Sequence, residues 1–147
     1  MMFLFEMASI RLSRRARFLL LALAVGLSAG FALAASLVPD PFGQGTHRQL
    51  GFPSCTILIL FGWPCPLCGM TTCFAHFVRG HWIQAAQVQP AGLLLAFESL
   101  LLLLFSLISA VRGTLVLPVQ IERCLLALMT TNLLVVSLFW ITRLLCG

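Results

Sequence analysis

The chain has 147 residues, of which 61% are hydrophobic and only 9% are charged. Soluble domains carry about 25% charged residues, so the composition excludes a water-soluble globular protein. It indicates an all-α, multi-pass membrane protein whose main partner is the lipid bilayer. The net charge of +5 comes from nine arginines and four acidic residues. Four of the arginines directly precede an apolar segment. We therefore expect them to contact the anionic surface of a membrane, and we expect no nucleic acid as a partner.

The N-terminal part combines a basic tail with a first membrane-spanning segment. Residues 18–38 contain no charged side chain, and about 20 apolar residues suffice to cross a bilayer as a helix. The positive-inside rule then places residues 1–17 in the cytoplasm. The alternative is a cleavable signal peptide. The apolar stretch exceeds the usual signal core of about 7–15 residues, which favours a retained helix.

A long loop, residues 39–90, follows the first span. Prolines and glycines in residues 39–54 end the helix. The apolar run at residues 55–64 is too short to span a membrane, and we expect it to lie at the interface or against the other helices. A Cys-Pro-Leu-Cys-Gly motif at residues 65–69 then begins the part of the chain where reactive side chains crowd together.

Two further apolar segments, residues 91–111 and 121–145, are predicted to span the membrane as helices. With the first span they form a single membrane domain over residues 18–147. Because the N-terminus is predicted to be cytoplasmic, the loop of residues 39–90 is expected on the outer side of the cell (inner) membrane. Disulfides persist on that side.

Residues 65–82 are predicted to form an amphipathic helix that lies at the membrane interface and carries the Cys motif. Gly69 weakens the case for an unbroken helix, so a helix that starts with Thr71 as its N-cap is the alternative. Either geometry places thiols near a helix N-terminus, which lowers the pKa of a thiol. Positions three or four residues apart share one helix face, and on this face lie Cys65, Cys68, Thr72, His76 and Arg79.

The Cys-x-x-Cys spacing of Cys65 and Cys68 suits two kinds of chemistry. The pair closes a disulfide, in which one thiolate attacks a partner and the other resolves the product. Alternatively, it supplies two of the four ligands of a zinc ion. The plain alternative is that these cysteines are small apolar residues in a turn. The other metal-ligand candidates in the loop are Cys55, Cys73, His76 and His81.

Glu98 is predicted to lie well inside a spanning helix. A carboxyl group at this depth normally faces a partner or a wet cavity and is a candidate functional residue. We expect it to pair with Arg143 of the third span or to be a neutral, hydrogen-bonded carboxyl, and a transport or proton-carrying role is the alternative. Asn132, with Thr130 and Thr131, is expected to form hydrogen bonds between helices.

Residues 65–71 form a Cys-Pro-x-Cys-Gly-x-Thr motif, followed by Gly80 and by Gln89-Pro90 before an apolar helix. This pattern resembles the bacterial membrane protein family called domain of unknown function 2752. In that family a short helix, a glycine and an Asn-Pro or similar pair follow the same motif. The resemblance covers about residues 55–104, roughly the central third of the chain.

One position departs from the family pattern. The family commonly has an arginine directly after the threonine of the motif, and here Thr72 stands in that place. A role of that arginine is therefore lost or passes to Arg79. Cys55 resembles an upstream cysteine of the family. The resemblance implies a membrane location and an important Cys motif, and it implies no reaction.

Three functional hypotheses follow. In the first, the protein is no enzyme, and Cys65 and Cys68 form a structural clasp, as a disulfide or as a metal site for zinc. In the second, it is a membrane thiol–disulfide oxidoreductase in which Cys65 attacks, Cys68 resolves, and Cys55 and Cys73 form another pair. In the third, it is a small transporter or a subunit that assembles with other membrane proteins and uses Glu98.

Overall fold

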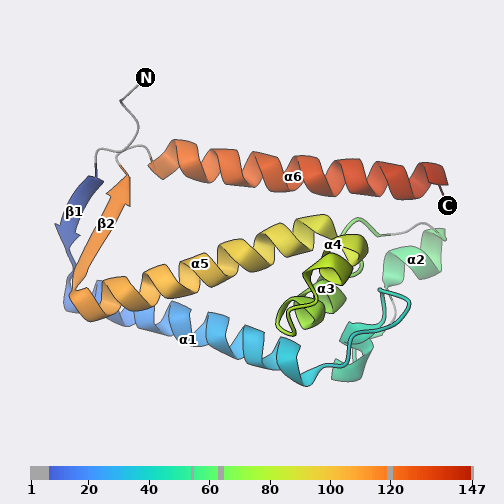
Figure 1. Ribbon diagram of the computed structural model, residues 1–147, viewed down its shortest axis with the longest axis horizontal. Helices are drawn as coiled ribbons and strands as arrows, with labels where there is room; N and C mark the ends of the chain where they lie inside the picture. Colours follow the sequence, from blue (N-terminus) through green and yellow to red (C-terminus); the bar gives the residue numbers. More distant parts are fainter. Residues whose placement is uncertain (1–6, 54, 63–64, 119–120, 147) are drawn as a thin grey trace.

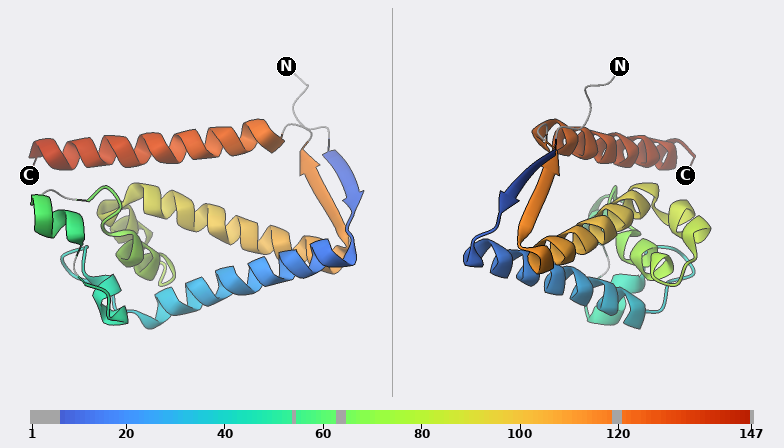
Figure 2. Two further views of the ribbon diagram at one scale, coloured as in Figure 1. Left: turned by 180° about the vertical axis from the view of Figure 1, so that it is seen from behind. Right: turned by 60° about the vertical axis from the view of Figure 1, so that its left-hand side comes forward.

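The computed structural model describes residues 7–53, 55–62, 65–118 and 121–146 (Figure 1). Among these residues three helices are long and apolar enough to cross a membrane. The predicted all-α membrane architecture is therefore confirmed. The three helices extend along the long axis of the molecule (Figures 1 and 2). They are α1 (Arg14–Ser36), α5 (Pro90–Arg112) and α6 (Ile121–Cys146).

Local signals set the ends of the spanning helices. Ser13 is the N-cap of α1, and its hydroxyl accepts a hydrogen bond of 3.2 Å from the backbone N–H of Ala16. Pro90 occupies the first turn of α5, where its missing N–H costs nothing. Gly113 ends α5 in the left-handed conformation (φ 71°). Both helices have 23 residues, about 34 Å at 1.5 Å per residue, which matches the hydrocarbon thickness of a bilayer.

Helices α1 and α5 pack closely, whereas α6 lies more loosely beside α5. The buried positions of the two packed helices are small side chains, including Ala24 on α1 and Ala96, Ser106 and Ala110 on α5. Small residues let two helix backbones approach each other within a membrane. Every side chain described on α6 is exposed or half-buried, so most of this helix is left to face lipid.

A short two-stranded sheet closes one end of the bundle and is absent from the sequence prediction. Strand β1 (Met7–Arg11) pairs antiparallel with β2 (Thr114–Pro118). The sequence predicts a basic tail and a short link there. It does not predict the sheet, because strands so far apart in the sequence leave no local pairing signal. The sheet lies at the end of α1 and α5 opposite the long loop (Figure 1). The part of the predicted tail at residues 1–6 lies outside the described residues.

The loop between α1 and α5 folds into short helices at the other end of the bundle (Figures 1 and 2). This end is the one where the Cys motif lies. Its elements are the 3₁₀ helix η1 (Thr46–Leu50), α2 (Thr56–Phe61), α3 (Met70–Phe77) and α4 (Trp82–Val88).

The prediction of a single helix over residues 65–82 is wrong. Gly69 adopts φ 99° and is the N-cap of α3, so the helix starts at Met70 and both cysteines of the motif precede it. The alternative N-cap, Thr71, lies inside the first turn. A second break separates α3 from α4 after Gly80, whose φ is 75°. Glycine tolerates positive φ where other residues do not, so the two glycines divide the segment.

Arg79 links α3 to the end of α1. Its guanidinium donates hydrogen bonds to the carbonyls of Ala35 (2.9 Å) and Leu37 (2.7 Å), with a longer one to Ala34 (3.4 Å). From the turn that follows α3, it also donates to the carbonyl of Ala75 within that helix. The last carbonyls of a helix lack intrahelical partners and attract cations. Arg79 therefore caps α1, which has no basic residue in its own last turn.

Candidate functional site

The Cys turn, residues 65–69, is a tight turn held by its own backbone. The N–H of Cys68 donates to the carbonyl of Cys65 at 3.1 Å, and the N–H of Met70 donates to that of Leu67 at 3.3 Å. Gly69 follows at φ 99°. A side chain there would also meet Val88 at 2.9 Å, so the turn depends on glycine for both conformation and space.

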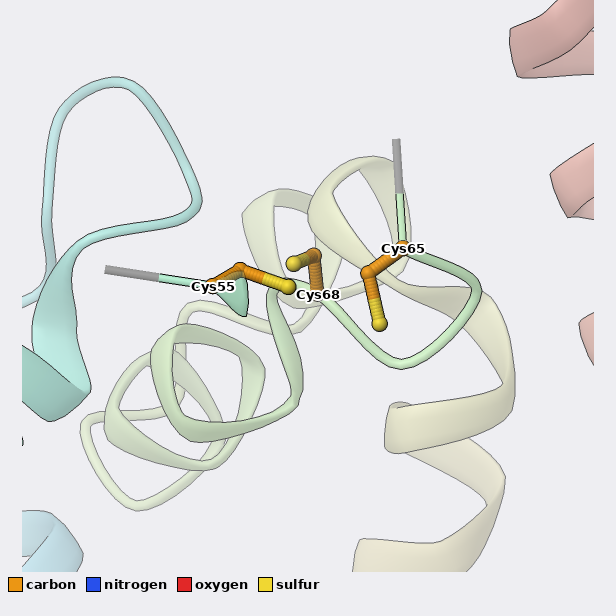
Figure 3. Close-up of side chains that lie close together, drawn as sticks. All are labelled: Cys55, Cys65 and Cys68. Carbon is orange, nitrogen blue, oxygen red and sulfur yellow. The ribbon is translucent and has the colours of Figure 1, made fainter. Parts of the chain in front are cut away.

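Three thiols converge at this turn. Cys55, directly before α2, points its sulfur toward those of Cys65 and Cys68 (Figure 3). The three sulfur atoms all lie within 4.8 Å of one another. Cys68 is buried, and the other two are half-buried. We call Cys55, Cys65 and Cys68 the thiol cluster. All three were predicted as metal-ligand candidates from the sequence. The sequence does not show, however, that Cys55 rather than Cys73 joins the two cysteines of the motif.

The thiol cluster fits the dimensions of a metal site. Sulfurs bound to one zinc ion are about 3.8 Å apart, given tetrahedral geometry and Zn–S bonds of about 2.3 Å. The three sulfurs lie within 4.8 Å of one another and therefore need to approach by about 1 Å or less to bind one ion. A cavity of about 180 Å³ lies against Cys55 and Cys68 and is also lined by Asp40 and Arg48. A tetrahedral ion with three protein ligands would have room there for a fourth, small ligand.

The local electrostatics keep Cys68 protonated. Burial, with smaller contributions from the neighbouring thiols of Cys55 and Cys65, raises the pKa of Cys68 to about 12. The expectation that a nearby helix N-terminus lowers thiol pKa values is therefore wrong for Cys68, because desolvation is the larger effect. A cation placed between the three sulfurs would reverse this, since metal coordination deprotonates a thiol outright.

The raised pKa makes a prediction about reactivity. In reduced, metal-free protein at pH 8, alkylation of Cys68 by iodoacetamide is expected to be about a thousandfold slower than that of a model thiol with a pKa of 9.0, because only the thiolate reacts. The rate should rise about tenfold per pH unit up to about pH 11. Mass spectrometry of timed samples measures it. A rate that levels off near pH 9 would contradict the assignment.

Two residues that the sequence does not assign to the site hold the Cys turn from outside. Gln89 is fully buried, and its side-chain N–H donates to the carbonyl of Pro66 at 2.8 Å. Arg143 of α6 donates to the carbonyls of Cys68 (3.4 Å) and Val88 (3.0 Å). Only Gln89 has a signal in the sequence, as the polar residue before Pro90. Arg143 on α6 is separated from the turn along the chain by three helices, α3, α4 and α5.

The predicted pairing of Arg143 with Glu98 is wrong. Both carboxyl oxygens of Glu98 accept hydrogen bonds from the side-chain nitrogen of Asn132, at 2.8 and 2.9 Å. The predicted interhelical hydrogen bond of Asn132 is thereby confirmed. The same prediction is wrong for Thr130 and Thr131, whose hydroxyls donate to backbone carbonyls of their own helix, α6. Arg143 lies about three helical turns beyond Asn132 on α6, at the level of the Cys turn.

Two other candidate ligands lie outside the thiol cluster. Cys73 is fully buried in α3, and its sulfur donates to the carbonyl of Gln89 at 3.4 Å. Burial raises its pKa to about 12. The ring of His76 lies 5.9 Å from the ring of His81, centroid to centroid, and is tilted by 52° against it. Burial, with smaller contributions from His81 and Arg79, lowers the pKa of His76. Neither Cys73 nor His76 is among the side chains whose ligand atoms converge on the cluster.

The threonines of the motif region serve the packing of α3. Thr72 is buried, and its hydroxyl shares a 2.8 Å hydrogen bond with that of Thr46 in η1. Thr46 in turn accepts from the N–H of Asp40 at 2.9 Å. Thr71 is half-buried and lines a small apolar cavity with Phe74. Thr72 thus anchors the start of the loop, whose residue Asp40 borders the cavity beside the thiols.

The fold and the site define a small multi-pass membrane protein with a cluster of three cysteine thiols at one end of its helices. Residues 55–107 match the model of the family described as protein of unknown function (DUF2752). This match confirms the resemblance seen in the sequence, and it begins at the first cysteine of the thiol cluster. Searches of the curated proteins and of the solved structures find no match to the chain.

Proposed function

We propose that the protein is a cell-membrane protein in which the thiol cluster binds one zinc ion as a structural clasp. The observation that supports this function is the convergence of three sulfurs, from two separate segments, within 4.8 Å of one another. Soft thiolate ligands select zinc over hard cations such as Mg²⁺ and Ca²⁺, and zinc is the usual ion of structural cysteine sites. An ion held by Cys55, Cys65 and Cys68 would join the start of α2 to the Cys turn.

The surroundings of α2 explain why a clasp is needed. The side chains described on this helix are all exposed: Ile57, Ile59, Leu60 and Phe61. A helix of six residues is too short to be stable by itself, and apolar side chains on it suit the membrane interface. A metal bond to Cys55 fixes one end of this segment to the rest of the loop.

A metal accounts for the cluster better than thiol–disulfide exchange does. A disulfide uses two sulfurs and leaves the third unused, whereas zinc engages all three. Exchange also requires a thiolate, and the pKa of about 12 leaves Cys68 a poor nucleophile and a poor leaving group at neutral pH. Zinc binding displaces the thiol protons, so the affinity for zinc increases with pH.

The distribution of arginines supports an outer location of the clasp. Six of the nine arginines belong to β1, the start of α1, the end of α5 or the start of α6, which meet at the end of the bundle with the sheet (Figure 1): Arg11, Arg14, Arg15, Arg17, Arg112 and Arg123. The positive-inside rule assigns that end, with the N-terminus, to the cytoplasm. At the other end Arg79 and Arg143 are occupied by backbone carbonyls. The thiol cluster is then extracytoplasmic.

A cobalt titration tests this function. Reduced protein in detergent is expected to bind one Co²⁺ per chain, with the absorption bands of thiolate-to-cobalt charge transfer, and Zn²⁺ should displace the cobalt. Cys55→Ser should weaken binding by about 100-fold. Cys124→Ser, which changes an exposed cysteine on α6, is the matched control and should bind like the wild type. If Cys55→Ser leaves the titration unchanged and Cys68→Ser traps mixed disulfides at Cys65, the oxidoreductase replaces the clasp.

A further inference from the structure

A cavity lies between α5 and α6 and is independent of the thiol cluster. We call it the α5–α6 groove; its volume is about 440 Å³, within the range of small-molecule sites. It runs from Met70, next to the Cys turn, along half the length of the two helices. Leucines from both helices form its walls, and the walls are partly exposed on the face that meets lipid: Leu95, Leu102, Leu125 and Leu128.

A polar pair interrupts this apolar groove. Glu98 and Asn132 both line it, and they are joined by the hydrogen bonds of 2.8 and 2.9 Å described above. One amide nitrogen serves both carboxyl oxygens, and the same nitrogen also donates to the carbonyl of Leu128 at 3.2 Å. A carboxyl group offers more acceptor positions than one amide nitrogen fills. Glu98 therefore retains acceptor capacity toward the groove, in a medium where unused polar groups are costly.

We infer that the α5–α6 groove binds one bilayer-soluble amphiphile, an apolar chain ending in a hydroxyl group that donates to Glu98. An ammonium head group would also donate, but a charged group costs far more than a neutral hydroxyl to bring among leucine side chains. A plain hydrocarbon chain would fill the groove and leave Glu98 unsatisfied. The hydroxyl satisfies the carboxyl, while the leucines and Met129 of the groove contact the chain.

The position of the groove between two helices supports a ligand that enters from lipid. Helix α6 is held at its far end by the bonds from Arg143 to Cys68 and Val88. Along the groove the contact between α5 and α6 includes the Glu98–Asn132 pair. Helices α1 and α5 contact each other directly through small buried residues. A ligand that bridges the walls of the groove would provide a comparable apolar contact between α5 and α6.

Photolabelling in phosphatidylcholine vesicles tests the inference, because this lipid has no hydrogen-bond donor in its head group. The probe is a 16-carbon primary alcohol with a diazirine at mid-chain, and the matched probe is its methyl ether. The alcohol is expected to label peptides of the groove about tenfold more than the ether, the ratio set by one hydrogen bond to a carboxyl group. Peptide mapping by mass spectrometry measures the ratio.

Three variants distinguish the effect of the hydrogen bond to Glu98 from the effect of the free volume in the groove. Glu98→Leu should reduce labelling by the alcohol to the level of the ether. Ser99→Phe, which fills the groove, should abolish labelling by both. Leu101→Phe is the matched control, because Leu101 is on the same helix but 66% exposed, and it should label like the wild type.

Glu98→Gln is a second test in case Glu98→Leu does not fold. The amide oxygen of glutamine still accepts a hydrogen bond, so this variant should retain part of the preference for the alcohol over the ether. Equal labelling by alcohol and ether in the wild type would overturn the inference. So would labelling that persists in Ser99→Phe.

Discussion

Removing bound zinc with a chelator is expected to lower the free energy of unfolding by about 4 kcal/mol, the linkage expected when free metal is about 1,000 times its dissociation constant. The clasp is the reason, because zinc binds the folded arrangement of Cys55, Cys65 and Cys68 and joins α2 to the Cys turn. Thermal unfolding in detergent, followed with and without EDTA, measures the change. The loop of residues 39–90 should open before the spanning helices do.

A Cys68→Ser variant is the control for this effect. It lacks the buried ligand of the cluster, so its unfolding temperature should be low already and should not respond to EDTA. Cys73→Ser should keep the response, because the sulfur of Cys73 bonds the carbonyl of Gln89 away from the cluster. An equal response to EDTA in the wild type and Cys68→Ser would show that the chelator acts elsewhere.

Gly69→Ala is expected to lower the free energy of unfolding by about 2–4 kcal/mol and to weaken zinc binding. Part of the cost is the positive φ of 99°, which a residue with a Cβ adopts at about 1–3 kcal/mol. The rest is overpacking, since the new methyl group would lie 2.9 Å from Val88 and 3.0 Å from the carbonyl oxygen of Gly43. Both effects act on the residue directly after Cys68.

Gly51→Ala separates the two causes. Gly51 has a similar positive φ of 81°, but nothing lies within 4 Å of a Cβ placed there. It should therefore show only the backbone cost and leave zinc binding unchanged. Thermal unfolding and the cobalt titration, applied to both variants, measure these quantities. If Gly51→Ala and Gly69→Ala lose the same stability and the same affinity, the close packing around the Cys turn has no role.

The spanning helices were predictable because their signal is local. An apolar run of about 20 residues fixes both the type and the length of a helix in a membrane. The predicted first span, residues 18–38, differs from α1 mainly at its start, where Ser13 caps the helix and Arg14 lies in its first turn. The composition does not reveal that a basic residue near the membrane surface is already helical.

The site was predictable only in part, because its geometry depends on contacts between distant segments. Helical periodicity suggested one face shared by Cys65, Cys68 and Thr72. Gly69 instead ends the turn before α3 begins. The thiols of Cys65 and Cys68 therefore lie outside this helix, whereas Thr72 is a buried residue of it. The third thiol, Cys55, joins them through the fold of the loop, and no spacing rule for a single helix predicts that contact.

The arginines show the same limit most clearly. Charge and depth suggested that Arg143 pairs with Glu98, as buried charges in membranes often pair. In the fold Arg143 bonds two backbone carbonyls beside the Cys turn, and Asn132 satisfies Glu98 instead. Arg79 likewise binds the last carbonyls of α1. Carbonyls left free at helix ends and turns become visible as partners only when the elements are placed in space.

The metal content of the protein purified from membranes tests the central claim most directly. Elemental mass spectrometry of wild-type protein, prepared without chelators, is expected to find about one zinc per chain. Thiol titration of the folded protein before and after zinc removal should then show additional reactive thiols at Cys55 and Cys65. The thiol of Cys68, whose pKa is raised to about 12, should react fully only after the zinc-free protein is denatured. Protein that contains no zinc and carries a Cys65–Cys68 disulfide in intact mass spectra would contradict the account.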